Sequence, residues 1–126
     1  ASLDLNTGEI VWSSPISFVN DILVHGSSIL GSTSSNVLVS LDKASGFVNW
    51  KYDVNKDITE PFIINKVVMI FSTDGTLYGY DIESGERVYV EEYGYDIHPK
   101  TEFIVEKNNI YFQTNDGETI HLRVDL

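Results

Sequence analysis

The sequence predicts an all-β protein built from β-propeller blades, with four short antiparallel strands in each blade. Three observations lead to this fold class. A turn motif occurs three times at an almost constant spacing, segments rich in β-branched and aromatic residues lie between the turns, and no segment has a convincing helical period. Repeats of about 40 residues made of strands are typical of propellers, because solenoids of this period use helices. A β-sandwich is the runner-up fold, but it does not require the repeated motif.

The repeated motif has the form D-x-x-[ST]-G-x-x-x-[WY] and reads DLNTGEIVW, DKASGFVNW and DIESGERVY in its three copies. The aspartate can accept hydrogen bonds from backbone N–H groups just ahead of it and close an Asx-type turn. The glycine supplies a positive φ, and the aromatic ring offers a large area to bury against a neighbouring sheet. The motif residues are Asp4, Gly8, Trp12, Asp42, Gly46, Trp50, Asp81, Gly85 and Tyr89.

These roles give three structural expectations. We predict that each motif turn links the third and fourth strands of a blade. Gly46 and Gly85 should have φ > 0, because each follows an Asx-type turn at a fixed distance. Trp12 and Trp50 should be mostly buried between sheets.

A second turn signal lies six residues before the position of the repeated aspartate. Asn36, Gly75 and Gly117 occupy it in successive units. The dipeptides Asp74-Gly75 and Asp116-Gly117 predict two-residue hairpins of type I′. Each unit therefore contains two consecutive hairpin turns.

The units follow one another in a regular order along the chain. Residues 1–15 supply a lone fourth strand with no blade of its own, 16–54 and 55–94 are full blades, and 95–126 form a three-stranded last blade. The run VVMIF in the middle unit is apolar at every position, which predicts a strand buried on both faces. Arg123 stands in the place of the repeated aspartate.

About three blades are too few to close a ring, because propellers have about four to eight. We therefore expect either part of a larger propeller or self-association. In the second case, strand 9–14 of one copy would complete the last blade of another copy and remove the unpaired edges.

Composition and charge exclude several function classes. Lys and Arg number 8 against 19 for Asp and Glu, so the net charge of −11 repels phosphate backbones and makes nucleic acid a poor partner. The chain has no cysteine, which excludes disulfides, zinc–thiolate sites and cysteine nucleophiles and leaves the redox compartment open. No apolar run approaches the roughly 20 residues of a membrane helix, and no signal peptide is visible.

No pattern in the sequence predicts catalysis, a cofactor or a metal site. His25, His98 and His121 lie on different repeats without metal-ligand spacing. The Asp-Gly dipeptides lack the further acidic ligands of a calcium loop. Serines are plentiful, but there is no G-x-S-x-G elbow and no phosphate-binding glycine loop. We therefore expect a protein that is not an enzyme.

The segment EEYGYDIHPK at 91–100 is the best candidate for a partner contact, since it joins two units and contains Tyr93, Tyr95, Asp96 and His98. Exposed tyrosines suit an interface, because they bury much area at a low entropy cost. The alternative is that one ring packs under the loop and the other caps the core. A weaker candidate is VNDI at 19–22, the equivalent junction of the first repeat.

The motif resembles the tryptophan-docking repeat of the PQQ-like β-propeller family over essentially the whole chain. The resemblance implies that the Asp–Gly turn joins the last two strands of a blade and that the aromatic residue docks onto the next blade. LDLNTGEIVW, FVNDILVHGSSI, DGTLYGYDIESGERV and NNIYFQTNDGETIHLRV are most similar to the C-terminal portion of the BamB family, which are propeller lipoproteins of the bacterial outer-membrane β-barrel assembly machinery.

This resemblance implies a non-catalytic scaffold that contacts protein partners of the assembly machinery through interblade loops and blade edges, with β-augmentation as one route. It also implies a periplasmic location, anchored to the outer membrane as part of a longer lipoprotein. Two alternatives stay open. One is a part of a PQQ-dependent dehydrogenase or another propeller enzyme, although the chain has no cysteine pair and too few blades to enclose a quinone. The other is a lumenal sensor with similar repeats.

Overall fold

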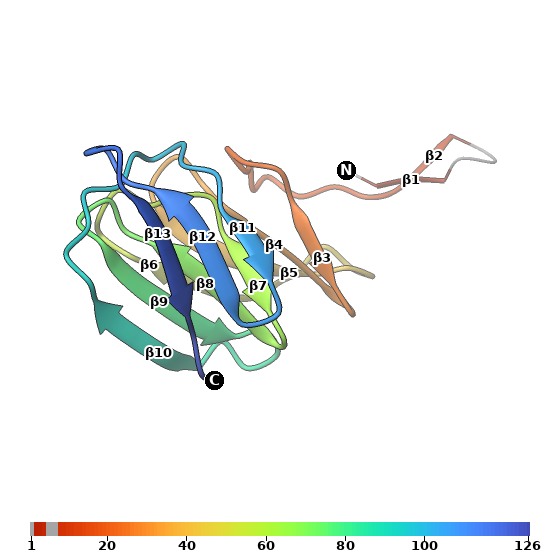
Figure 1. Cartoon of the computed structure of the whole chain (residues 1–126). Helices are drawn as coiled ribbons and strands as arrows, with labels where there is room; N and C mark the ends of the chain where they lie inside the picture. Colours follow the sequence, from red (N-terminus) through yellow and green to blue (C-terminus); the bar gives the residue numbers. More distant parts are fainter. Residues whose placement is uncertain (1, 5–7) are drawn as a thin grey trace.

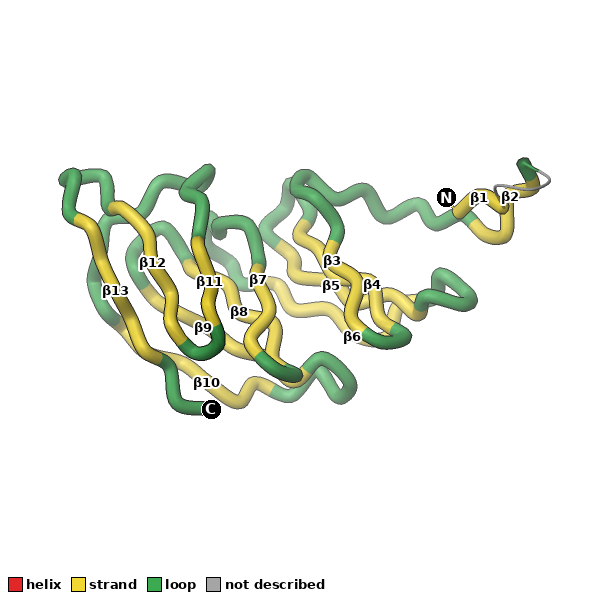
Figure 2. The backbone as a smooth tube through the Cα atoms, turned by 45° about the vertical axis from the view of Figure 1, so that its right-hand side comes forward, coloured by secondary structure: helices red, strands yellow, loops and turns green. Residues whose placement is uncertain are grey.

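The computed structural model contains three antiparallel sheets that lie one after another, and a short hairpin extends away from them at the N-terminal end (Figures 1 and 2). The structure describes residues 2–4 and 8–126, with side chains from residue 8 onward. The side chain of Asp4, the first aspartate of the motif, lies outside the described residues. Every regular element that the structure describes is a strand, which confirms the all-β fold class.

Each sheet is a meander in which consecutive strands pair antiparallel, as in a propeller blade. Blade 1 consists of β3 (Leu23–His25), β4 (Ser28–Ser32), β5 (Val37–Asp42) and β6 (Val48–Asp53). Blade 2 consists of β7 (Phe62–Ile64), β8 (Val67–Phe71), β9 (Thr76–Asp81) and β10 (Arg87–Glu92). Blade 3 consists of β11 (Ile104–Glu106), β12 (Asn109–Gln113) and β13 (Thr119–Arg123).

The N-terminal hairpin consists of β1 (Ser2–Asp4) and β2 (Glu9–Trp12). The sequence predicts a lone fourth strand here, but the structure pairs β2 with β1 in antiparallel register, with Leu3 opposite Ile10. The hairpin therefore repeats the third and fourth strands of a blade rather than the fourth alone.

Two apolar cores lie between the blades. The first joins blades 1 and 2 and contains Leu30, Leu38, Ile58, Val68, Ile70, Tyr80 and Ile82. The second joins blades 2 and 3 and contains Phe62, Ile64, Val67, Met69, Phe71, Leu77, Ile97, Ile110, Phe112 and Val124. Strand β8 contributes to both cores and is buried at every position, because successive side chains point to opposite faces of a sheet. This confirms the prediction for VVMIF.

The Asp–Gly motif closes the turn between the third and fourth strands, as predicted. The Oδ1 atom of Asp81 accepts hydrogen bonds from the backbone N–H groups of Glu83 and Ser84, each at 3.0 Å. The hydrogen bond from the Ser84 backbone is the main reason why the pKa of Asp81 lies below its ordinary value. The N–H of Gly85 donates to the carbonyl of Asp81 at 2.8 Å. Gly85 has φ 74° and Gly46 has φ 77°, so both have the positive φ that the sequence predicts.

The second hairpin of each blade is not the two-residue type I′ turn that the Asp-Gly dipeptides predict. Type I′ requires positive φ at both central residues, but Asp74 does not have it and Gly75 has φ 88°. The N–H of Ser72 donates to the carbonyl of Thr76 at 2.9 Å, which leaves a loop of three residues. Asn36 (φ 63°) and Gly117 (φ 84°) take the same left-handed position in the other blades. A three-residue loop reverses the chain with one residue in the left-handed conformation, whereas a type I′ turn needs two.

The motif tryptophans dock onto the following motif turn. The Nε1–H of Trp12 donates to the carbonyl of Lys43 at 2.9 Å, and that of Trp50 donates to the carbonyl of Ile82 at 2.8 Å. Each indole ring also covers the motif glycine of that turn. Both tryptophans keep some exposure but are mostly buried, as predicted. The fourth strand is the outermost strand of a blade, so its aromatic ring keeps one edge open to water.

Candidate functional site

The predicted contact segment runs from the end of β10 to the start of β11 and is fastened to the second hairpin loop of blade 2. The N–H of Tyr93 donates to the carbonyl of Gly75 at 2.9 Å, and the N–H of Ile97 donates to the carbonyl of Thr73 at 3.1 Å. Ile97 is 1% exposed and belongs to the core between blades 2 and 3. The segment is therefore held by its backbone and by one buried side chain.

The two tyrosines of the segment are half-buried and serve the interior. Their rings stack with centroids 5.9 Å apart and planes 9° from parallel. The hydroxyl of Tyr93 shares a 2.7 Å hydrogen bond with that of Tyr89, and burial raises the pKa of Tyr93. Tyr95 meets Phe112 edge-on at 5.9 Å between centroids. Tyr93 and Tyr95 therefore join blades 2 and 3, which leaves them little surface for a partner.

Asp96 belongs to a further repeat that the sequence analysis missed. Its carbonyl accepts the N–H of Asn115 at 2.9 Å, just as the carbonyl of Asp57 accepts the N–H of Thr73 at 2.9 Å one blade earlier. In both junctions an isoleucine follows, and that isoleucine is buried between blades. The signal that could have revealed this role is the dipeptide Asp-Ile at positions 21–22, 57–58 and 96–97.

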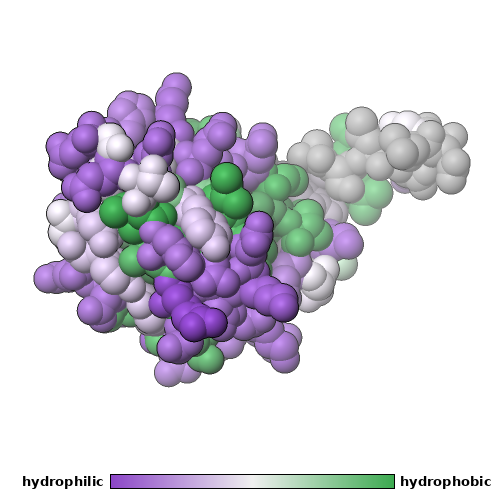
Figure 3. Space-filling view, in the orientation of Figure 1, coloured by the Kyte–Doolittle hydropathy of each residue, from purple (hydrophilic) through white to green (hydrophobic). Residues whose placement is uncertain are grey.

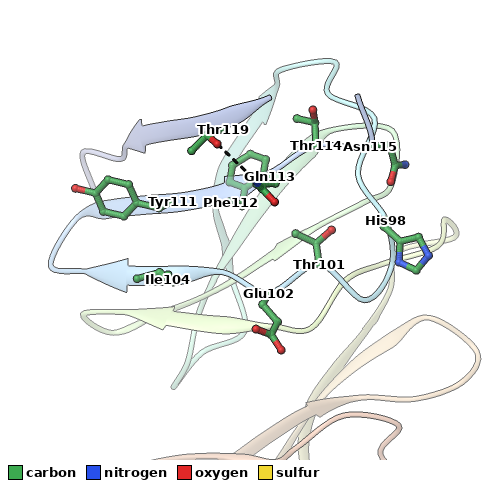
Figure 4. A pocket seen from close by; sticks show the side chains of 10 residues that line it. All are labelled: His98, Thr101, Glu102, Ile104, Tyr111, Phe112, Gln113, Thr114, Asn115 and Thr119. Carbon is green, nitrogen blue, oxygen red and sulfur yellow. Dashed lines mark hydrogen bonds between the residues drawn. The ribbon is translucent and has the colours of Figure 1, made fainter. Parts of the chain in front are cut away.

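His98 is exposed and lies beside an open surface. Its Nδ1 accepts the N–H of Lys100 at 3.0 Å, and its carbonyl accepts the N–H of Thr101 at 3.0 Å. The imidazole lies at the rim of a pocket of about 530 Å³ (Figure 4). The pocket is lined by His98, Thr101, Glu102, Ile104, Tyr111, Phe112, Gln113, Thr114, Asn115 and Thr119. We call it the blade 3 pocket; Tyr93, Tyr95 and Asp96 do not line it.

The blade 3 pocket opens on the front face of blade 3, by which we mean the face turned away from blade 2. In blade 2 the corresponding front positions carry large apolar side chains and are covered by blade 3. The cross-strand pair Phe71–Leu77 of blade 2 becomes Gln113–Thr119 in blade 3. Hydrophilic residues accordingly cover most of the surface over β11–β13, with small hydrophobic patches between them (Figure 3). The front face of blade 3 is therefore more polar than the corresponding face of blade 2.

One apolar and one aromatic feature lie within this polar face. Ile104 is 63% exposed and stands opposite Tyr111 in the sheet. The Tyr111 ring stacks on His121 with centroids 4.5 Å apart, and Nε2 of His121 is 3.0 Å from Oδ1 of Asn109. The sequence analysis missed Ile104 and Tyr111, although the alternation of NIYFQ assigns Tyr111 and Gln113 to the face opposite the core. His121 is exposed, although its strand TIHLRV is rich in apolar residues.

The weaker candidate, VNDI, lies on the opposite side of blade 1. Val19 and Ile22 are 59% and 54% exposed, and Asn20 donates from Nδ2 to the hydroxyl of Ser32 at 3.0 Å. Ile22 lines an apolar pocket of about 270 Å³ together with Trp12, Ser14, Ile16, Phe18, Val24, Ile29, Leu41 and Lys43. This pocket lies on the back face of blade 1, by which we mean the face turned away from blade 2. The back face of blade 1 is mostly apolar, whereas the front face of blade 3 is mostly polar.

The described residues contain no group of three or more His, Asp or Glu side chains placed to hold a metal ion. Nor does that part of the chain contain a helix that is long and apolar enough to cross a membrane. The residues of the blade 3 pocket offer hydrogen bonds, one carboxylate and one imidazole. This set suits recognition of a polar surface.

The meander blades, the Asp–Gly turns and the tryptophans docked on glycine define a β-propeller protein with PQQ-like repeats. A family model described as "Outer membrane protein assembly factor BamB" matches residues 1–125. The chain therefore belongs to the BamB family, which confirms the resemblance seen in the sequence.

Known relatives agree with this assignment. Outer membrane protein assembly factor BamB of Legionella pneumophila (strain Paris) is 27% identical over 127 residues, which cover 98% of this chain and 32% of that protein. The crystal structure of BamB from Moraxella catarrhalis matches with a TM-score of 0.80 at 18% identity, over 97% of this chain and 36% of that chain. The chain thus spans about a third of the length of the curated relatives it matches.

The fold is shared with enzymes as well. A quinohemoprotein alcohol dehydrogenase from Pseudomonas putida HK5 matches with a TM-score of 0.66 at 17% identity, over 81% of this chain and 18% of that chain. A likeness at this identity concerns the fold alone, since one fold supports many functions.

Proposed function

We propose that this chain is a non-catalytic protein-interaction part of a BamB-like subunit that acts in outer-membrane protein assembly on the periplasmic side. The family and the names of its relatives support the process. The observation that carries the interaction role is the blade 3 pocket, an open polar surface next to a junction segment that is fixed by hydrogen bonds and stacked rings.

The fixed junction matters because binding is stronger when the contact groups are held in place beforehand. Immobilising a mobile side chain or loop on binding lowers affinity, and a preordered surface avoids that cost. His98 and Thr101 are held through the backbone, and the Tyr93–Tyr95 stack supports the loop from inside. Non-obligate interfaces combine polar rims with a few aromatic and aliphatic anchors, as Tyr111 and Ile104 provide here.

The substitution Ile104→Asp tests this proposal. It places a charge in the lining of the pocket, at a side chain that is 63% exposed, so the fold should tolerate it. We expect the affinity for the purified outer-membrane assembly machinery to fall about tenfold, in line with an interface anchor. Surface plasmon resonance, with the chain immobilised, measures this affinity.

Val24→Asp is the matched control, because Val24 is 54% exposed on the back face of blade 1 and the charge change is the same. Its affinity for the machinery should equal that of the unchanged chain. Equal losses for both variants would mean that charge alone matters. Unchanged binding for Ile104→Asp would place the partner surface elsewhere.

A further inference from the structure

A second cavity lies at the opposite end of blade 3, where the first hairpin turns of blades 2 and 3 come together. Its volume is about 460 Å³, and it is lined by Asn65, Lys107, Asn108, Asn109, Arg123 and Asp125. We call it the Arg123 cavity. It shares no residue with the blade 3 pocket, because β12 begins at Asn109 and ends at Gln113, at the other end of the strand.

The Arg123 cavity is cationic within an acidic protein. The chain carries a net charge of −11, yet the cavity combines two cations with a single carboxylate, that of Asp125. Within the described part of the chain, neither Lys107 nor Arg123 forms an ion pair, although Asp125 lines the same cavity. The two cations and the side-chain amides of Asn65 and Asn108 offer N–H donors for which the cavity supplies one carboxylate, that of Asp125.

Lys107 has a left-handed backbone conformation that lysine seldom adopts. It is the first loop residue of its hairpin and has φ 53°. Gly26 (φ 58°) and Asn65 (φ 55°) occupy the equivalent positions of blades 1 and 2. Glycine and asparagine tolerate this left-handed conformation, whereas a lysine is strained in it. Backbone strain of this kind gathers at functional sites.

Arg123 is a second position at which blade 3 carries a cation where the other blades do not. Asp42 and Asp81 occupy its position in blades 1 and 2, where their carboxylates accept hydrogen bonds from their own turns. A guanidinium cannot accept hydrogen bonds, so Arg123 cannot serve the turn in that way. Two separate departures from the repeat thus bring a positive charge to the same cavity.

The walls of the cavity are fixed by hydrogen bonds. The N–H of Val124 donates to the carbonyl of Asn108 at 2.9 Å, which holds the end of β13 against the hairpin turn. Asn109 stands opposite Arg123 in the sheet, and its Nδ2 donates to the carbonyl of Glu106 at 3.2 Å. The two cationic positions are therefore set by the backbone.

We propose that the Arg123 cavity binds an oxyanion, a phosphate or carboxylate group, between Lys107 and Arg123. The guanidinium offers a planar fork of N–H donors that matches two oxygen atoms of either group. The ammonium group of Lys107 adds a point charge from the neighbouring turn. This site is independent of the proposed protein contact at the blade 3 pocket.

Amide chemical shifts of the isotope-labelled chain test the proposal, with inorganic phosphate and acetate as probes at constant ionic strength. We expect saturable shifts at Lys107, Asn108 and Arg123 with at least one probe, and the comparison tells which oxyanion fits better. Arg123→Gln should weaken binding about tenfold, as expected for the loss of a charged hydrogen-bond donor. The absence of saturable shifts with both probes would overturn the proposal.

Lys107→Asn gives a second and sharper test. Asparagine accepts the left-handed conformation, so this variant should melt at the same temperature as the unchanged chain or higher, and yet bind the oxyanion about tenfold more weakly. Lys66→Gln removes the same charge from the equivalent hairpin of blade 2, outside the cavity, and should leave binding unchanged. Equal weakening by both variants would show that only the total charge of the protein matters, and would overturn the site.

Discussion

Gly46 and Gly85 have no side chain, and the tryptophan ring of the preceding motif packs in the space that a Cβ atom would occupy. A Cβ atom added to Gly46 would lie 2.4 Å from Cε3 of Trp12, and one added to Gly85 would lie 2.5 Å from Cγ of Trp50. Both glycines also have positive φ, so two separate requirements coincide at one residue. The repeated motif therefore encodes the turn and the docking surface for the preceding blade at the same time.

Gly85→Ala should destabilise the fold more than Gly117→Ala. Gly117 has φ 84° and nothing within 4 Å of the added Cβ, so its substitution measures the left-handed strain alone, about 1 kcal/mol. Gly85→Ala adds the collision with the Trp50 ring, which should cost about 1–3 kcal/mol more. Unfolding in denaturant measures both free energies. Equal losses would show that the contact with Trp50 contributes nothing to stability.

At the scale of elements, the segments that join the blades are tied to the hairpin loops that follow them. Thr73 in the β8–β9 loop donates its N–H to Asp57 of the preceding junction and accepts the N–H of Ile97 from the next one. One loop thus holds two junctions. Lys56 strengthens the first of these contacts through its 2.8 Å ion pair with Asp74 in the same loop.

The Lys56–Asp74 pair gives a testable dependence of stability on pH. The hydrogen bond from Lys56, followed by that from Ser72, lowers the pKa of Asp74 to about 2 from an ordinary value of 3.8. A lowered pKa in the folded state stabilises the fold above pH 3.8, and this contribution is lost as the pH falls from about 4 to about 2.

Asp74→Asn should therefore lower the melting temperature at pH 7 and have a much smaller effect near pH 2, where the carboxylate of the folded, unchanged chain is about half protonated. The effect should be small, because both side chains of the pair are about half exposed. Glu83→Gln is the control, since this exposed side chain belongs to no ion pair among the described residues. A constant difference across the pH range would argue against the ion pair as the cause.

At the scale of the molecule, the two end faces differ in character. The back face of blade 1 presents Ile22 and Val24, each more than half exposed, and both line an apolar pocket. The front face of blade 3 carries polar side chains at most of the positions that are apolar in blade 2. Apolar surface exposed in a continuous patch favours association. The back face of blade 1 is therefore the stronger candidate for a contact between copies.

We expect the 126-residue chain to self-associate at micromolar concentration, with a mass by light scattering above that of one copy. Val24→Asp should reduce this mass, because it introduces a charge into the apolar surface, whereas Ile104→Asp on the front face should leave it unchanged. Circular dichroism confirms that both variants are folded. A single-copy mass for the unchanged chain would exclude self-association and, with it, completion of the last blade by strand 9–14 of another copy.

The repeat could be predicted from the sequence because its determinants are local. An Asp–Gly turn, a left-handed glycine and alternating apolar residues act within a few positions of each other, so the succession of hairpins and the buried strand β8 follow from the order of residues. The positions of two of the three hairpin turns in each of blades 1 and 2 can be predicted for this reason. The family could also be named, because the motif repeats in register.

Which of the candidate contact residues are buried between blades, and which lie on the surface, depends on the tertiary structure. Tyr93 and Tyr95 have the composition of a contact loop, but the packing of blade 3 against blade 2 takes up their rings. Ile104 and Tyr111 lie on the open face of blade 3, which they share with the polar side chains of Gln113 and Thr119. Lys107 and Arg123 are 16 residues apart in sequence (123 − 107), and only the pairing of β12 with β13 brings them to one cavity. Local patterns determine strands and turns, whereas the contacts between blades depend on distant residues that meet only in the folded chain.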